Sequence, residues 1–157
     1  MNDAEKLFLT GGGHARAAHA LIVAANTNVH MNVPFYLLVG FAFETVLKAA
    51  YLHLGGNMNA AKNEVRHSLP KALAYAKDQG FQPENEQVAW IVETMEEVHL
   101  NHAFRYLTGD GTLQVADATV SLDILDDLVA QVGQLLYPEH DKAHWVTLLR
   151  TYDPRQT

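Results

Sequence analysis

The chain contains no cysteine among its 157 residues, which excludes structural disulfides and a catalytic thiol. This absence is typical of proteins from a reducing compartment, and we expect a cytoplasmic location. The opening MNDAEKLFLTGGG lacks the basic segment and long apolar core of a secretory signal. The apolar run from Val29 to Phe43 is shorter than the roughly 20 residues of a membrane span. We therefore expect a buried core helix there and no membrane partner.

Basic charge is scarce. The sequence has 11 lysines and arginines against 18 acids, a formal net charge of -7, and no run of basic residues. This balance opposes non-specific binding to nucleic acid or to an anionic membrane. The nine histidines are a separate feature, because they reduce the net negative charge as the pH falls toward 6.

Strand-like alternation, internal repeats and low-complexity segments are also absent, whereas apolar residues recur at helical spacing along most of the chain. The sequence predicts an all-α fold: a five-helix up-and-down bundle in a single domain spanning 1–157. We expect Gly11–Gly13 to break the chain after an N-terminal arm (1–12), and a polar loop at 57–66. The tail (139–157) should form a short sixth helix or an arm. The five helices are expected at 14–29, 33–54, 69–79, 83–107 and 117–137. Ser68 is the expected N-cap of the third helix and Asp117 the start of the fifth, while Gly55 and Gly80 should end the second and third.

The second of these helices is apolar on almost every face, so it should be buried on almost every face. Its positions expected to be inaccessible are Leu38, Phe41, Ala42, Val46 and Ala49. On the last helix, in contrast, Asp123, Asp126 and Asp127 are expected to face water.

Two charges interrupt the second helix. Glu44 and Lys48 stand four residues apart and therefore share one face. A charged pair in the most buried element lies either at a seam between helices or in a functional site.

A group of short motifs resembles the HEPN domains, the nucleotide-binding helical domains of higher eukaryotes and prokaryotes. The residues that carry the resemblance are Glu44, Lys48-Ala49, Gly55, His67-Ser68-Leu69 and Arg105-Tyr106, and it extends over roughly 13–137. The resemblance implies a homodimer and a nucleotide, RNA or protein partner, in a defence or toxin–antitoxin-type setting. It also marks five residues as ligand-binding candidates: Glu44, Lys48, His67, Arg105 and Tyr106.

Catalytically active HEPN members are metal-independent ribonucleases in which an arginine is followed, after four to six residues, by a histidine. Here the positions after Arg105 are Asp110, Gly111 and Thr112, so the motif is absent. His99 and His102 precede Arg105 instead, and these three residues are the only catalytic candidates. We therefore expect a non-catalytic binding module, with a divergent ribonuclease as the alternative.

A metal-binding bundle is a weaker alternative. Glu96-x-x-His99 and Glu64-x-x-His67 have the spacing of di-iron bundles, but such sites need two further inward glutamates. The pair at 64–67 also falls in the expected loop. The glycine triplet has no preceding strand and no following Lys-Ser/Thr, so it does not predict a phosphate loop. We expect no metal and no cofactor.

The apolar tail residues Trp145, Leu149 and Tyr152 need to be covered by other side chains, which favours a dimer.

Overall fold

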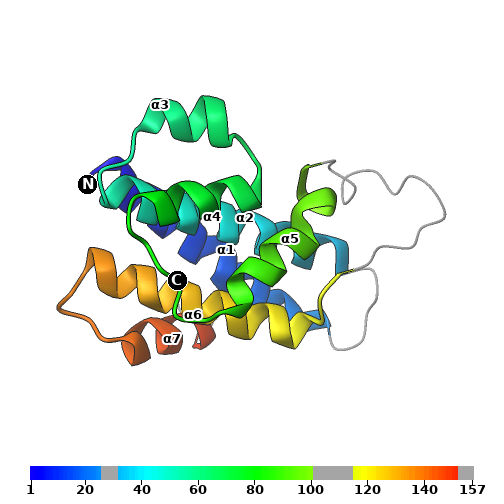
Figure 1. Cartoon of the computed structure of the whole chain (residues 1–157). Coiled ribbons are helices and arrows are strands. Elements are labelled where there is room, and N and C mark those ends of the chain that lie inside the picture. The colour runs from blue at the N-terminus through cyan, green and yellow to red at the C-terminus, as the bar shows by residue number, and fades with distance from the viewer. Residues whose placement is uncertain (26–31, 101–114, 152–157) are drawn as a thin grey trace.

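The computed structural model describes residues 1–25, 32–100 and 115–151, and in these residues it contains helices and no strand (Figure 1). The all-α prediction is confirmed. The elements are α1 (Asp3–Ala25), α2 (Asn32–His53), α3 (Met58–Ala60), the π-helical turn η2 (Ala61–Val65), α4 (Leu69–Asp78), α5 (Gln87–Leu100), α6 (Ala118–Leu136) and α7 (Lys142–Arg150).

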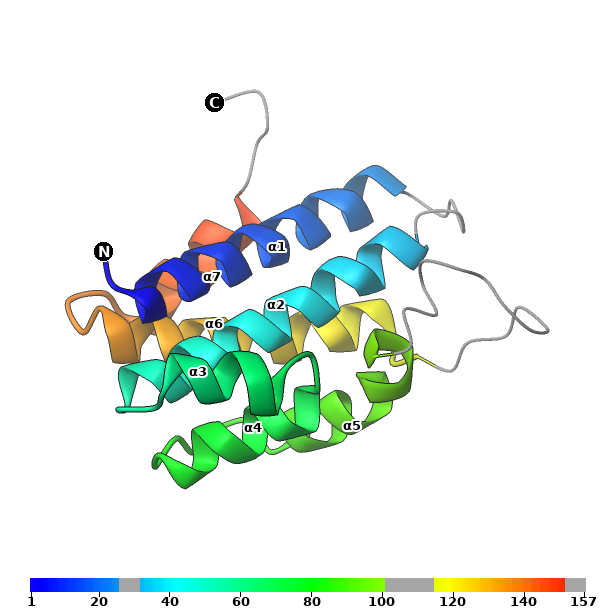
Figure 2. The ribbon, with the colours of Figure 1, turned by 90° about the horizontal axis from the view of Figure 1, so that it is seen from above.

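Helix α2 is the centre of the bundle. It packs against α1, α4, α5 and α6, and Figure 2 shows α1 on one side of it and α4 on the other. Ala42, Val46 and Ala49 have no exposed surface, as predicted, whereas Leu38 and Phe41 are only partly buried. By length and composition, residues Val33–His53 could cross a membrane, but 61% of the apolar window is buried among the other helices.

Several predicted helix ends are confirmed. The side chain of Ser68 accepts a hydrogen bond from the backbone N–H of Lys71 at 3.3 Å, and that of Asp117 accepts from two N–H groups of α6. Such caps satisfy amide groups that have no partner within the helix. Gly55 and Gly80, which follow α2 and α4, have φ of +102° and +97°, a conformation that favours glycine.

The expected N-terminal arm is wrong, because α1 runs without a break through Gly11–Gly13. A Cβ on Gly11 would lie 2.6 Å from Val46 Cγ2 and 2.7 Å from Thr45 Oγ1. The glycine therefore allows α1 to approach α2 closely. Burial of Phe8 on the first turns of α1 also stabilises the helix, so tertiary packing outweighs the poor helix propensity of glycine.

The expected polar loop at 57–66 is also wrong, because it contains α3 and η2. Asn57 caps this element through its side chain, and Ala61 and Val65 are buried against the bundle. Further along the chain, α5 begins at Gln87, four residues later than predicted. The preceding segment is tied to α6 instead: the backbone N–H of Glu84 donates to Gln131 Oε1 at 3.0 Å.

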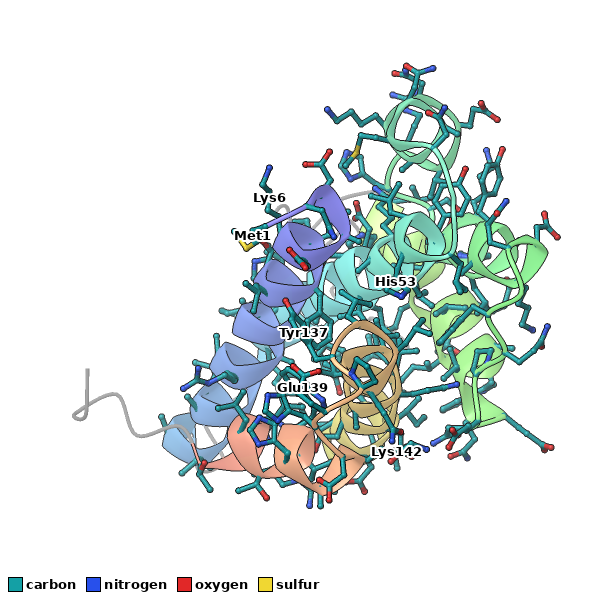
Figure 3. The ribbon with its side chains drawn as sticks, turned by 90° about the vertical axis from the view of Figure 1, so that its left-hand side faces the viewer. Met1, Lys6, His53, Tyr137, Glu139 and Lys142 are labelled. Atoms are coloured by element: carbon teal, nitrogen blue, oxygen red, sulfur yellow. The ribbon has the colours of Figure 1, made fainter. Side chains whose placement is uncertain are left out.

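The tail contains the predicted sixth helix, α7, which packs on α1 and α6 of its own chain. Trp145 and Leu149 are 7% and 2% exposed, so they need no second copy to cover them, while Tyr152 lies outside the described residues. The indole ring lies over Gly133, where a Cβ would be 2.7 Å away. Figure 3 shows Tyr137 at the end of α6 facing α1, where its ring lies 6.0 Å from that of Phe8.

A buried ion cluster joins the same three helices. Asp126, expected to face water, is 1% exposed. Its carboxylate lies 2.7 Å from His19 Nε2 of α1 and accepts a hydrogen bond from Arg150 Nε of α7 at 2.8 Å. The prediction for Asp126 fails because packing of α1 and α7 against α6 buries a helix face that the local sequence marks as polar, and two basic side chains replace water as its partners.

Candidate functional site

Glu44 is the centre of a polar cluster enclosed by α2, α5 and the turn before α4. Its side chain is 7% exposed. Oε1 accepts a hydrogen bond from Lys48 Nζ at 2.7 Å, and Oε2 lies 2.8 Å from His99 Nε2. His67 Nδ1 lies 3.2 Å and 3.3 Å from the two oxygens. Both carboxylate oxygens therefore have partners.

The surroundings of Glu44 act on its pKa in opposite directions. Burial raises the pKa, whereas the hydrogen bonds and charges of His99 and Lys48 lower it, and the net result is a pKa of about 2. The carboxylate is therefore ionised at any physiological pH. A group with this pKa is poorly suited to exchange protons near neutrality.

His99 lies inside the bundle. It is 8% exposed, and a Cβ on Gly40 would be 2.5 Å from its Nδ1, so the glycine provides the space for the imidazole ring. The ring of Phe41 stands edge-on to it, with centroids 5.4 Å apart. His99 is thus fixed by Glu44 on one edge and by α2 on the other.

On the far side of Phe41 lies His14 of α1, which the sequence did not mark as part of a site. The rings of His14 and Phe41 have centroids 5.7 Å apart. His14 Nδ1 is buried and has no hydrogen-bond partner in the described part of the chain. Burial lowers the pKa of His14, and the charge of Glu44 opposes this effect. The sequence did not indicate the contact of His14 with Phe41, because the glycine triplet was interpreted as a break.

Lys48 links the buried cluster to the surface. Its Nζ also donates to the backbone carbonyl of Arg66. Arg66 has φ of 54° and ψ of -115°, and it is the only residue besides glycine with positive φ in the described ranges. The backbone N–H of Ser68 donates to the carbonyl of Val65 at 3.1 Å, which closes a tight turn. Arg66 is exposed, and the side chain of His67 is 61% exposed.

The pairs proposed for a di-iron site have other roles. Glu96 accepts hydrogen bonds from Ser68 Oγ at 2.5 Å and from the backbone N–H of Leu69 at 2.8 Å, so it caps the start of α4. Glu64 accepts from the Tyr75 hydroxyl at 2.6 Å. Within residues 1–25, 32–100 and 115–151 no three His, Asp or Glu side chains are placed to hold a metal ion.

The structure therefore brings together four of the predicted site residues: Glu44, Lys48, His67 and His99. The other three, His102, Arg105 and Tyr106, lie outside the described residues. Sequence reasoning missed Arg66 and Gly40 as well as His14. Arg66 directly precedes the motif at His67, but its unusual backbone conformation has no signature in the sequence.

No protein-family model, no curated protein and no solved structure matches this chain. The resemblance to HEPN domains therefore depends on the residues quoted above.

Proposed function

We propose that this protein is a HEPN-like helical binding module that takes a nucleotide or RNA and performs no chemical step on it. The chain order of its five longest elements before the tail supports this proposal: α1, α2, α4, α5 and α6 follow one another as expected for a five-helix bundle. The motif residues Glu44, Lys48 and His67 also lie in a single cluster.

Among the described residues, the observation that carries the non-catalytic assignment is the closed cluster around Glu44, which includes the catalytic candidate His99. The oxygens of Glu44 are occupied by Lys48, His67 and His99, and its pKa is about 2. A general acid or base needs a pKa near the working pH and free access to the reacting oxygen. Glu44 has neither property, so its role is to hold helices and the turn at Arg66 in place.

The alternative is a divergent ribonuclease that uses His99 or His102 with Arg105. The environment of His99 argues against its part in this alternative. An RNA-cleaving histidine must reach the 2'-hydroxyl or the leaving oxygen, yet His99 is 8% exposed and its Nε2 faces Glu44. An arginine alone stabilises a phosphate but cannot exchange protons near neutral pH.

The test measures binding and cleavage in the same samples. The full chain is titrated with fluorescent single-stranded and structured RNA and with a nucleotide, and is incubated with the RNA in EDTA. We expect binding that weakens at high salt, with intact RNA. Absence of binding would overturn the binding module. Cleavage lost in both Arg105→Ala and His102→Ala would establish the ribonuclease instead.

A further inference from the structure

We propose that the Arg66–His67 turn binds a phosphate group, through the Arg66 guanidinium and the outer edge of the His67 imidazole. This inference rests on the proposed function only for the identity of the molecule that contains the phosphate, which is a nucleotide or an RNA strand.

Arg66 has a backbone conformation that an arginine rarely adopts. Its φ of 54° and ψ of -115° are those of the first central position of a type II' turn, where glycine is strongly favoured. A residue with a Cβ atom is strained in this conformation. Such strain persists only where surrounding contacts impose it, and it is concentrated at ligand-binding and active sites.

Buried charges impose this conformation. Lys48, which is 9% exposed, donates to the Arg66 carbonyl while it pairs with Glu44. Removing two charges from water costs several kcal/mol before their attraction offsets it. An apolar pair would hold α2 in the core at lower cost, but it could not bind the carbonyl. The buried pair thus fixes an exposed arginine at a defined place on the surface.

The two side chains of the turn are directed to solvent. His67 Nδ1 faces Glu44, so Nε2, on the opposite edge of the ring, points away from the carboxylate. No described acid forms an ion pair with the guanidinium of Arg66, because Glu64 bonds to Tyr75 and Glu96 caps α4. A guanidinium without an acidic partner is suited to bind phosphate through paired N–H groups.

The charge distribution favours the same place. Between Met58 and Asp78 the sequence has four bases and two acids, a net charge of +2, whereas the rest of the chain has seven bases and 16 acids, -9. Figures 1 and 3 show α3 projecting from the bundle beside α4, so the basic segment lies at one side of an acidic molecule. An anion is therefore attracted to this side.

The experiment titrates the 15N-labelled full chain with pyrophosphate at low salt and follows the amide signals of 64–71 by NMR. We expect saturable shifts at Arg66 and His67. Arg66→Gly should abolish them and yet melt at a temperature no lower than the original protein, because glycine relieves the positive φ. Arg66→Ala should weaken binding at least tenfold. Lys6→Ala, at an exposed position of α1 outside the basic segment, makes the same change in net charge; it is the control and should bind as before.

Shifts scattered over the surface, or saturable shifts that survive Arg66→Gly, would overturn the phosphate site. The same variant also separates this inference from the proposed function. If RNA or nucleotide binds equally well to Arg66→Gly, the turn is not the contact although the binding module stands. If pyrophosphate binds at the turn but neither RNA nor nucleotide binds, the phosphate site stands and the proposed function fails.

Discussion

At the scale of single residues, Glu44 joins its own helix to two parts of the molecule that are distant in sequence. It binds Lys48 one helical turn away, His67 before α4 and His99 on α5. Removal of one partner from a buried ion pair leaves an uncompensated charge, which costs more than the pair contributes as a whole. The stability of the bundle should therefore depend strongly on this one carboxylate and on its ionisation.

Glu44→Gln should lower the free energy of unfolding at pH 7 by roughly 3 kcal/mol, because Lys48 loses its buried counter-charge. In the original protein the pKa of Glu44 falls from 4.5 in the unfolded chain to about 2 in the folded one. Its contribution is therefore complete above the unfolded pKa and is lost as the pH falls from 4.5 to 2. Urea unfolding at several pH values measures both effects.

The exposed Glu93 on the same helix as His99 provides the matched control for that series. Glu93→Gln should leave the unfolding free energy within about 0.5 kcal/mol, as surface substitutions usually do. Equal effects of the two substitutions would show that Glu44 does not stabilise the fold.

At the scale of elements, the glycines of α1 have different roles although they are consecutive. A Cβ on Gly11 would collide with Val46 and Thr45 of α2, whereas a Cβ on Gly12 or Gly13 would have no atom within 4 Å. The close approach of α1 and α2 thus requires Gly11 alone. The other two glycines only lower the helix propensity of α1.

Gly11→Ala should destabilise the protein by about 1–3 kcal/mol, because the methyl group must push α1 away from α2. Gly12→Ala, in the same helix, should stabilise it by up to about 1 kcal/mol through higher helix propensity. Thermal and urea unfolding of the two variants measures these opposite signs. The same sign for both would contradict the close packing of α1 on α2.

At the scale of the whole molecule, α2 is surrounded by α1, α4, α5 and α6, and its stability is that of the bundle. Ala42, in the middle of this helix, has no exposed surface. Ala42→Asp should abolish cooperative folding, because a buried unpaired carboxylate costs several kcal/mol. Circular dichroism and thermal melting measure this loss.

The control is Ala74→Asp, at an exposed position of α4, which should fold normally. A cooperatively melting Ala42→Asp protein would contradict the central position of α2.

The homodimer stays a prediction, and it is now supported by exposed apolar side chains of α5 in place of those of the tail. The tail no longer supports it, since Trp145 and Leu149 pack on their own chain. On α5, Trp90 is 49% and Leu100 41% exposed, and we propose that these two apolar side chains lie in the dimer contact. Sedimentation at micromolar concentration should give twice the monomer mass of 17.4 kDa. A Trp90→Glu variant should shift the protein to monomer, and a monomeric original protein would contradict the prediction.

The sequence by itself determined the features that depend on local patterns. Helical periodicity predicted the all-α class, the apolar character of α2 predicted its burial, and Ser68, Asp117, Gly55 and Gly80 marked helix ends through their caps and backbone preferences. The pair Glu44 and Lys48 was found because residues four apart share a helical face.

Only the tertiary structure decided the features that depend on contacts between distant segments. The helix through Gly11, the burial of Asp126 between His19 and Arg150, and the space over Gly40 for His99 are all of this kind. The local sequence favours a break at Gly11 and an exposed acid at Asp126, and it does not indicate the space over Gly40. Packing reverses the first two preferences, because local propensity contributes only about 1 kcal/mol or less. Burial and ion pairing between helices contribute a larger free energy.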